Sequence, residues 1–273
     1  MRGFNHRTAE DEGLMQTADC VAIYDWSAPT DPPAWLDFAL GCFERAGLKP
    51  DVISGELPGG QKKKFRSPKG ARDYISSSGP VQSLSLHATR PGYKQLIFGW
   101  RMTAAVNWLG VDPKTALIAW EAGALDRISV LRELAALLGP AYGIGFKRGF
   151  AFGPDLYVYG MAAGYGYGSA DRIKSDLVAD WFREVSRRHR NGLLRDVYPL
   201  NLLTACHLAR PLGDATLESW IGGAEDRGRL EELFPGQWLW SLDESVITSV
   251  RRVLAENGLL IARYSAATGF ETA

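Results

Sequence analysis

The chain is poor in cysteine and histidine, and this limits the chemistry that it can carry. Its 273 residues include three cysteines, Cys20, Cys42 and Cys206, at wide spacings. An odd number of scattered cysteines argues against a disulfide framework and favours reduced thiols, buried as small apolar residues. The four histidines are too scattered for a local zinc motif. The sequence therefore predicts no metal site and indicates no cofactor.

Net charge and long apolar runs are missing too. Lysine and arginine number 31, as do aspartate and glutamate, so the formal charge is zero. A neutral chain lacks the broad attraction that supplies most non-specific affinity for nucleic acids. No stretch approaches the roughly 18 apolar residues of a membrane span, and residues 1–19 show no apolar core of a secretory signal. We expect a cytoplasmic protein that binds no membrane, and nucleic acid is disfavoured as a partner.

Apolar residues make up 46% of the chain, which is ample for a core. The pattern of elements predicts an α+β fold, with a largely antiparallel sheet and amphipathic helices packed on it. We expect one domain over residues 1–273. A subdivision into a strand-helix-strand unit at 1–90 and the main sheet with its helices at 91–273 stays open.

The first ninety residues contain a predicted strand-helix-strand unit. Residues 20–26 form the first strand. Asp31 and the two prolines after it begin a helix, because proline at the first helical positions gives up only N–H groups that lack partners. The helix ends at Gly47, and residues 51–57 form the next strand.

A basic run follows at residues 59–70, which we interpret as an exposed loop. Its charged residues, with one just beyond it, are Lys62, Lys63, Lys64, Arg66, Lys69 and Arg72. A contact with phosphates or with an acidic partner is the alternative, although one basic patch in a neutral chain is a weak sign of a nucleic-acid site.

The middle of the chain alternates strands with one well-delimited helix. Strands are predicted at 81–89, 94–108 and 115–121. A helix follows Asp126 as N-cap and ends at Gly139. The short apolar runs at 111–120 and 200–212 fit either a helix or a strand.

Aromatic residues and glycines then alternate from Tyr142 onward. The pattern predicts two antiparallel strands joined by a turn at residues 153–155. In the first strand the aromatic side chains share one face, and Gly143 and Gly145 share the other. A glycine-lined face admits close approach, either by a ligand or by side chains of a neighbouring element.

The C-terminal part is predicted to hold two more helices. The first spans 169–191, and its basic end is interpreted as solvated; it carries Arg183, Arg187, Arg188, His189 and Arg190. A strand at 237–242 precedes the second helix, which begins at a capping box of Ser241 and Glu244. A strand at 259–264 follows.

Two constellations could carry chemistry. Gly164, Gly166, Gly168 and Ser169 stand before a predicted helix, where an anion would be favoured, although their spacing matches no nucleotide fingerprint. Cys206 and His207, with Asn201 and His87 elsewhere, could supply a thiol, a base and an orienting amide. A buried thiol beside a hydrogen-bonded histidine is the favoured explanation of the pair, and we assign no catalytic residue.

Nine tryptophans are many for this length. Trp238 and Trp240 share one face of a predicted strand. Most tryptophans are expected in the core, but an exposed one would be the kind of anchor whose loss costs about 2 kcal/mol at a protein interface.

The C-terminal third resembles a family of uncharacterised bacterial proteins. The resemblance rests on "LLRDVYPLNLLTACHLARPLGDATLESWI" and "GQWLWSLDESVITSVRRVLAENGLL", in which R-D-x-Y-P, N-x-L, H-L and T-L-x-x-W-I elements precede a tryptophan strand and a last helix. Some such proteins look like immunity proteins of bacterial polymorphic or type VI toxin systems. The resemblance implies a protein that binds and blocks a cognate toxin, and it brings no catalytic role.

Two functional hypotheses follow. The first is a non-catalytic binding protein, with a protein partner such as a cognate toxin. Its candidate partner-binding residues are Trp238, Trp240, Trp220, Arg195, Asp196 and His207, and the resemblance also carries Tyr198, Pro199, Asn201 and Leu208. The alternative is an enzyme that acts on a small anionic substrate at the glycine-rich turn, with Asp196 or His207 as acid or base.

Overall fold

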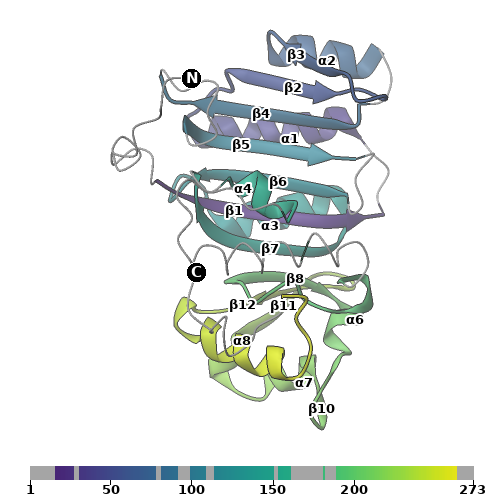
Figure 1. The fold of residues 1–273 in the computed structure, drawn as a ribbon, viewed down its shortest axis with the longest axis vertical. Helices are drawn as coiled ribbons and strands as arrows, with labels where there is room; N and C mark the ends of the chain where they lie inside the picture. The colour runs from purple at the N-terminus through teal and green to yellow at the C-terminus, as the bar shows by residue number, and fades with distance from the viewer. Residues whose placement is uncertain are drawn as a thin grey trace, which may run out of the picture.

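An antiparallel sheet extends along the longest axis of the molecule (Figure 1). The computed structural model describes residues 16–27, 31–77, 81–91, 99–108, 114–150, 153–160, 181 and 189–262. Within them the sheet has ten strands, in the order β11-β12-β8-β7-β1-β6-β5-β4-β2-β3, and all neighbours are antiparallel. The predicted α+β class with a largely antiparallel sheet is confirmed.

The strands of this sheet are β1 (Thr17–Trp26), β2 (Val52–Glu56), β3 (Lys62–Phe65), β4 (Ser83–Thr89), β5 (Trp100–Asn107), β6 (Thr115–Glu121), β7 (Pro140–Gly149), β8 (Leu200–Thr204), β11 (Arg229–Phe234) and β12 (Gln237–Ser241). A separate pair is formed by β9 (Pro211–Leu212) and β10 (Ala215–Thr216). The predicted strand at 115–121 is confirmed at both ends, and the described part of the prediction at 94–108 forms β5.

The central strand β1 is buried on both of its faces. It lies between β6 and β7, so that Val21 is opposite Ile118 and Gly145. Because side chains alternate along a strand, Val21 belongs to the core on one face of the sheet and Tyr24 to the core on the other. Each face of the sheet therefore has its own apolar layer.

Three helices cover the face to which Val21 points: α1 (Pro32–Arg45), α2 (Pro68–Ser77) and α3 (Arg127–Leu138). Their ends follow the sequence signals. Asp31 accepts a hydrogen bond from the Ala34 amide at 3.0 Å, and Asp126 accepts one from the Ser129 amide at 2.8 Å. Gly139 ends α3 with a φ of 60°, in the left-handed region. The predictions for the ends of α3 are confirmed.

The other face carries shorter elements, and most of them come from the C-terminal third. They are α4 (Pro154–Val158), α6 (Ala205–Leu208), α7 (Leu217–Gly222) and α8 (Ile247–Glu256), with 3₁₀ turns η4 (His189–Asn191), η5 (Glu225–Arg227) and η6 (Glu244–Val246). The apolar face of α8, with Val250 and Leu254, packs into this second core. Among the helices that the structure describes, none has the length and apolar character needed to cross a membrane.

The predicted second strand of the glycine-aromatic hairpin is wrong. The first strand is β7, but the residues after Gly153 form the helix α4. Gly153 adopts a φ of 56°, and Pro154 takes the first helical position, for which its fixed φ is suited. The same glycine-proline signal that suggested a turn between strands instead begins a helix.

The interpretation of residues 59–70 as a loop is also wrong. Gly59 and Gly60, with φ of 88° and 81°, form a tight turn that brings Lys62 opposite Glu56. The basic run thereby becomes strand β3 and the start of α2. Charged residues are poor strand formers by propensity, and here pairing with β2 overrides that preference.

The C-terminal predictions are corrected in two respects. Asp243 accepts a hydrogen bond from the Ser245 amide at 2.8 Å and caps η6, so the box of Ser241 and Glu244 does not form. The expected strand at 259–264 is represented, up to residue 262, by one parallel bridge between Leu194 and Leu260.

Most of the helix expected at 169–191 lies outside the described residues. Of that span, Trp181 is helical and buried, and residues 189–191 form η4.

The glycine-lined face of β7 is filled by its neighbour. A Cβ atom placed on Gly145 would lie 2.8 Å from Cδ1 of Leu200, and one on Gly143 would lie 3.1 Å from Cβ of Leu202. Both leucines belong to β8. Close packing by a neighbouring strand, and not a ligand, therefore explains these two glycines.

We expect Gly145→Ala to lower the free energy of unfolding by about 1–3 kcal/mol, because the new methyl group overpacks the contact with Leu200. Urea denaturation measures the change. The matched control is Gly41→Ala in α1, where an added Cβ meets nothing within 4 Å; it should stabilise the protein by about 0.5–1 kcal/mol. Equal effects of the two substitutions would contradict the packing argument.

Candidate functional site

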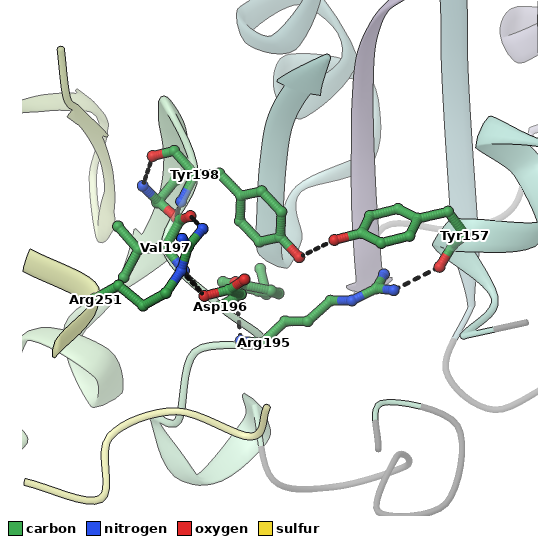
Figure 2. A network of polar contacts seen from close by, with 8 residues as sticks. Tyr157, Arg195, Asp196, Val197, Tyr198 and Arg251 are labelled. Carbon is green, nitrogen blue, oxygen red and sulfur yellow. Dashed lines mark hydrogen bonds and ion pairs between the residues drawn. The ribbon is translucent and has the colours of Figure 1, made fainter. Parts of the chain in front are cut away.

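The R-D motif lies in a segment that joins the sheet to the C-terminal residues. The Leu194 amide donates to the Leu259 carbonyl at 3.0 Å, and the Ile261 amide donates back to the Leu194 carbonyl at 2.7 Å. From this clamped position Arg195 and Asp196 extend in different directions, toward α4 and toward α8 (Figure 2).

The Arg195 side chain is 3% exposed and is fully engaged by the protein. Its guanidinium donates to the hydroxyl of Tyr24 at 2.8 Å and to the carbonyls of Val158 and Tyr157 at 3.2 and 2.5 Å. It also lies over the ring of Tyr157, at 4.2 Å, and near that of Trp181, at 5.0 Å. The two carbonyls are the last of α4, where a cation is favoured. The buried charge is thus stabilised by a helix end, a phenol and ring faces.

Asp196 ties the same segment to α8. Its Oδ1 accepts hydrogen bonds from Nε of Arg251 at 2.8 Å and from the Val197 amide at 2.7 Å. Arg251 also donates to the Val197 carbonyl at 3.2 Å. The carboxylate is 14% exposed and the arginine side chain 8%. This charge pair fastens the last described helix to the R-D segment.

Tyr198 and Asn201 complete the network shown in Figure 2. The hydroxyl groups of Tyr157 and Tyr198 lie 2.8 Å apart. The Asn201 amide closes a turn, because its Nδ2 donates to the Tyr198 carbonyl at 2.7 Å and its Oδ1 accepts from the Tyr198 amide at 3.2 Å. Burial raises the pKa of Tyr198 well above its usual value, so this phenol stays protonated and acts as a hydrogen-bonding group.

His207 is buried at the start of α6. Its Nδ1 accepts a hydrogen bond from the Thr204 amide at 3.2 Å and lies 2.9 Å from the Thr204 hydroxyl, which completes a capping box. The ring stacks on Tyr142, with centroids 5.4 Å apart. Because Nδ1 accepts from an N–H group, the proton of the neutral ring lies on Nε2. Burial, helped by the charge of nearby His189, lowers the pKa of His207 to about 4.

The Cys206 thiol lies 3.5 Å from Nδ1 of His207, closer than adjacent side chains are expected to come. The thiol is exposed, whereas Cys20 and Cys42 are buried. Asn201 is occupied in its own turn, and His87 belongs to β4, where it stacks on Trp100. The structure therefore brings the thiol and the imidazole together but not the rest of the suggested catalytic set.

His189 was expected at a solvated helix end, and this is wrong. The ring is fully buried, and its Nε2 lies 2.7 Å from Oδ2 of Asp25. Asp25 has a φ of 46°, an unusual conformation for a residue other than glycine. It directly follows Tyr24, which binds Arg195. A second polar contact, between η4 and the end of β1, thus lies beside the Arg195 network.

The three tryptophans predicted to bind a partner lie on α7 and β12, away from the R-D segment in the sequence. Trp240 is fully buried on β12, and its indole N–H donates to the Arg227 carbonyl at 2.7 Å, so it cannot serve as an exposed anchor. Trp238 on the same strand and Trp220 on α7 are half-buried. The guanidinium of Arg227 covers Trp220 at 4.6 Å and donates to its carbonyl at 2.8 Å.

The acid-base chemistry considered for Asp196 and His207 has little support in this geometry. Asp196 is committed to Arg251, and Nδ1 of His207 is committed to the Thr204 cap. Gly164, Gly166, Gly168 and Ser169 lie outside the described residues. Among the residues that are described, no group of three or more histidine, cysteine, aspartate or glutamate side chains could hold a metal ion.

Several residues of the network carried no local signal in the sequence. Tyr24, Tyr157 and Asp25 are ordinary residues of a strand and a helix until the fold brings them to Arg195 and His189. Arg251 did carry one, because it stands three residues before Leu254 on the apolar face of α8, where a charge needs a partner.

The comparisons with known proteins give a likeness of fold. No family model and no curated protein matches the chain. Among solved structures, the Pseudomonas aeruginosa T6SS protein PA0821 is similar with a TM-score of 0.56, over 92% of this chain and 76% of that one, at 11% sequence identity. At this identity the likeness shows a shared fold and no more.

We expect Arg195→Met to lower the free energy of unfolding by about 2–4 kcal/mol, because it removes the charge-assisted hydrogen bonds that the guanidinium donates to the Tyr24 hydroxyl and to the Val158 and Tyr157 carbonyls. Chemical denaturation measures the loss. Arg229→Met is the control, since that side chain is 80% exposed, and it should change stability by less than about 0.5 kcal/mol. An equally small effect at Arg195 would contradict the role given to the buried guanidinium.

Stability should fall on acidification because of His207. Its pKa is about 4 in the folded protein and about 6.5 when unfolded. The unfolded state therefore binds a proton first, and stability is lost as the pH falls from about 6.5 toward 4, by about 2 kcal/mol at pH 5. Urea denaturation at pH 7.5 and pH 5 measures this. The drop should be smaller in His207→Gln; an unchanged drop in that variant would disprove the assignment.

Proposed function

We propose that this chain is a non-catalytic binding protein of a type VI secretion setting, and that it acts as an immunity protein by occluding a cognate toxin. The observation that carries the proposal is the shared fold with the T6SS protein PA0821 over 92% of the chain. The resemblance of residues 193–260 to proteins that look like immunity proteins points in the same direction and is independent of the coordinates.

The burial of the motif residues supports a structural role for them. Arg195, Asn201 and His207 are each at most 3% exposed, and Arg195, Asn201 and Nδ1 of His207 form hydrogen bonds within the chain. A binding protein needs such residues to hold its surface rigid, because preorganisation reduces the entropy lost on association. Partner recognition then falls to the exposed side chains that this frame holds.

The α7 and η5 surface is the candidate that the tryptophans indicate. Trp220 is half-buried and Arg227 lies over it, while Glu218, Glu225 and Asp226 around them are exposed. Tryptophan and arginine are the residue types enriched among interface hot spots, and acidic neighbours form a polar rim. A partner that displaces solvent from this pair would find an anchor that is already positioned.

The test is protection from toxicity. Type VI effectors of the source organism are expressed one at a time in a bacterial host, with and without this chain. One effector should be neutralised and should co-purify with the chain in a stoichiometric complex. Neutralisation of none of them would overturn the proposal, and neutralisation by enzymatic turnover at substoichiometric amounts would replace it with a catalytic function.

We expect Trp220→Ala to weaken binding of that effector about tenfold or more, because it removes the central aromatic anchor. Isothermal titration calorimetry measures the change in Kd, and circular dichroism checks that the variant folds. The matched control is Ile128→Ala on α3, since Ile128 is an exposed apolar side chain, at 37%. Equal affinities of the two variants would place the interface elsewhere.

A further inference from the structure

The basic run occupies the outermost strand of the sheet. β3 pairs with β2 along one side and stands last in the strand order, at the top of Figure 1. In the part of the chain that the structure describes, no residue hydrogen-bonds to its other side. An edge strand of this kind presents a row of amide and carbonyl groups that another extended segment can pair with.

The exposed charged side chains of this strand are basic, and Glu56 of β2 lies opposite Lys62 in the register. Lys62 and Lys64 are exposed, as is Arg66 directly after the strand, and none of the three has an ion-pair partner among the described residues. The basic residues that follow on α2 are different, since Lys69 pairs with Asp73 and Arg72 with Asp37. The free charge is thus concentrated on the edge itself.

The strand is held in place from beneath. The side chains of β3 alternate: Lys62 and Lys64 are exposed, and Lys63 and Phe65 are half-buried. The Lys63 ammonium lies 3.8 Å from the ring centroid of Tyr74 on α2, and the Phe65 ring packs against the same tyrosine at 5.6 Å. This contact fixes the face of β3 that packs on α2, so that Lys62 and Lys64 share the opposite face of the strand.

We propose that the β3 edge accepts an extended acidic segment of a partner protein as an additional strand, with carboxylates beside Lys62 and Lys64. This inference deepens the proposed function and rests on it. The backbone of the added segment would pair with the free amide and carbonyl groups of β3, and its alternate acidic side chains would meet the lysines. A nucleic acid could use the charges and its phosphates could accept from the amides, but phosphates donate no hydrogen bond to the carbonyl groups of the strand.

The lysines also disfavour pairing of β3 with basic segments. Two copies of this chain cannot pair through β3, because like charges would face each other across the new ladder. The edge spans four residues, or about 13 Å, so the added strand is short. Its binding should accordingly be of roughly micromolar affinity and should weaken with salt.

The experiment measures binding of a fluorescent eight-residue peptide that alternates glutamate and valine, by anisotropy at low salt. Wild-type protein should bind it, and Lys64→Glu should bind at least fivefold more weakly. The matched control, Lys49→Glu, makes the same charge change at an exposed lysine off the strand and should bind as the wild type does. A peptide of the same sequence with alternate backbone nitrogens methylated should not bind.

Four results would overturn the proposal. Equal binding of the methylated peptide would show that only charge matters. Equal losses in the Lys64 and Lys49 variants would remove β3 from the contact. A duplex DNA oligonucleotide that binds more tightly than the peptide, with the same dependence on Lys64, would make the edge a polyanion site. If the peptide fails to bind while the chain still neutralises an effector, this inference fails and the proposed function stands.

Discussion

The burial of one guanidinium group connects more of this structure than any other interaction. Arg195 binds the end of α4 and the hydroxyl of Tyr24 on β1, and its own amide donates to the Tyr142 hydroxyl on β7 at 3.1 Å. A buried charge is tolerated only when its donors are satisfied. The acceptors come from three separate parts of the chain, so all three must be in place together.

The need to hold these parts of the chain together arises from the sheet. Because β1 is apolar on both faces, the sheet needs a layer on each side. One layer consists of three regular helices, and exposed ion pairs such as Arg45 with Glu133 lie between them. The other is assembled from short helices and connecting segments around its own apolar cluster. Arg195 with α4, Asp196 with Arg251, and His189 with Asp25 join these short pieces through buried or half-buried polar contacts.

The separation of buried motif residues from exposed charged residues indicates which surfaces could bind a partner. The motif that suggested an immunity protein is largely buried, so it describes the frame and leaves the partner unspecified. The formal charge of zero is equally uninformative about surfaces, because Lys62 and Lys64 stand together on a free sheet edge while acidic residues gather around η5. The net charge of the chain sums basic and acidic residues that the fold places on different surfaces. A partner interacts with the local charge of one surface and not with the net charge.

The sequence by itself determined those elements whose signals are local. Asp31 and Asp126 begin their helices because a carboxylate can reach the amide three residues on, and Gly139 ends one because it tolerates a positive φ. Tertiary structure decided the rest. Gly153 and Pro154 suit a turn or a helix start equally, and packing on β1 selects the helix. The lysines of β3 form a strand only because β2 lies beside them, and His189 is buried only because Asp25 reaches it. The contact of His189 with Asp25 joins residues 164 positions apart in the chain, and a local pattern carries no record of it.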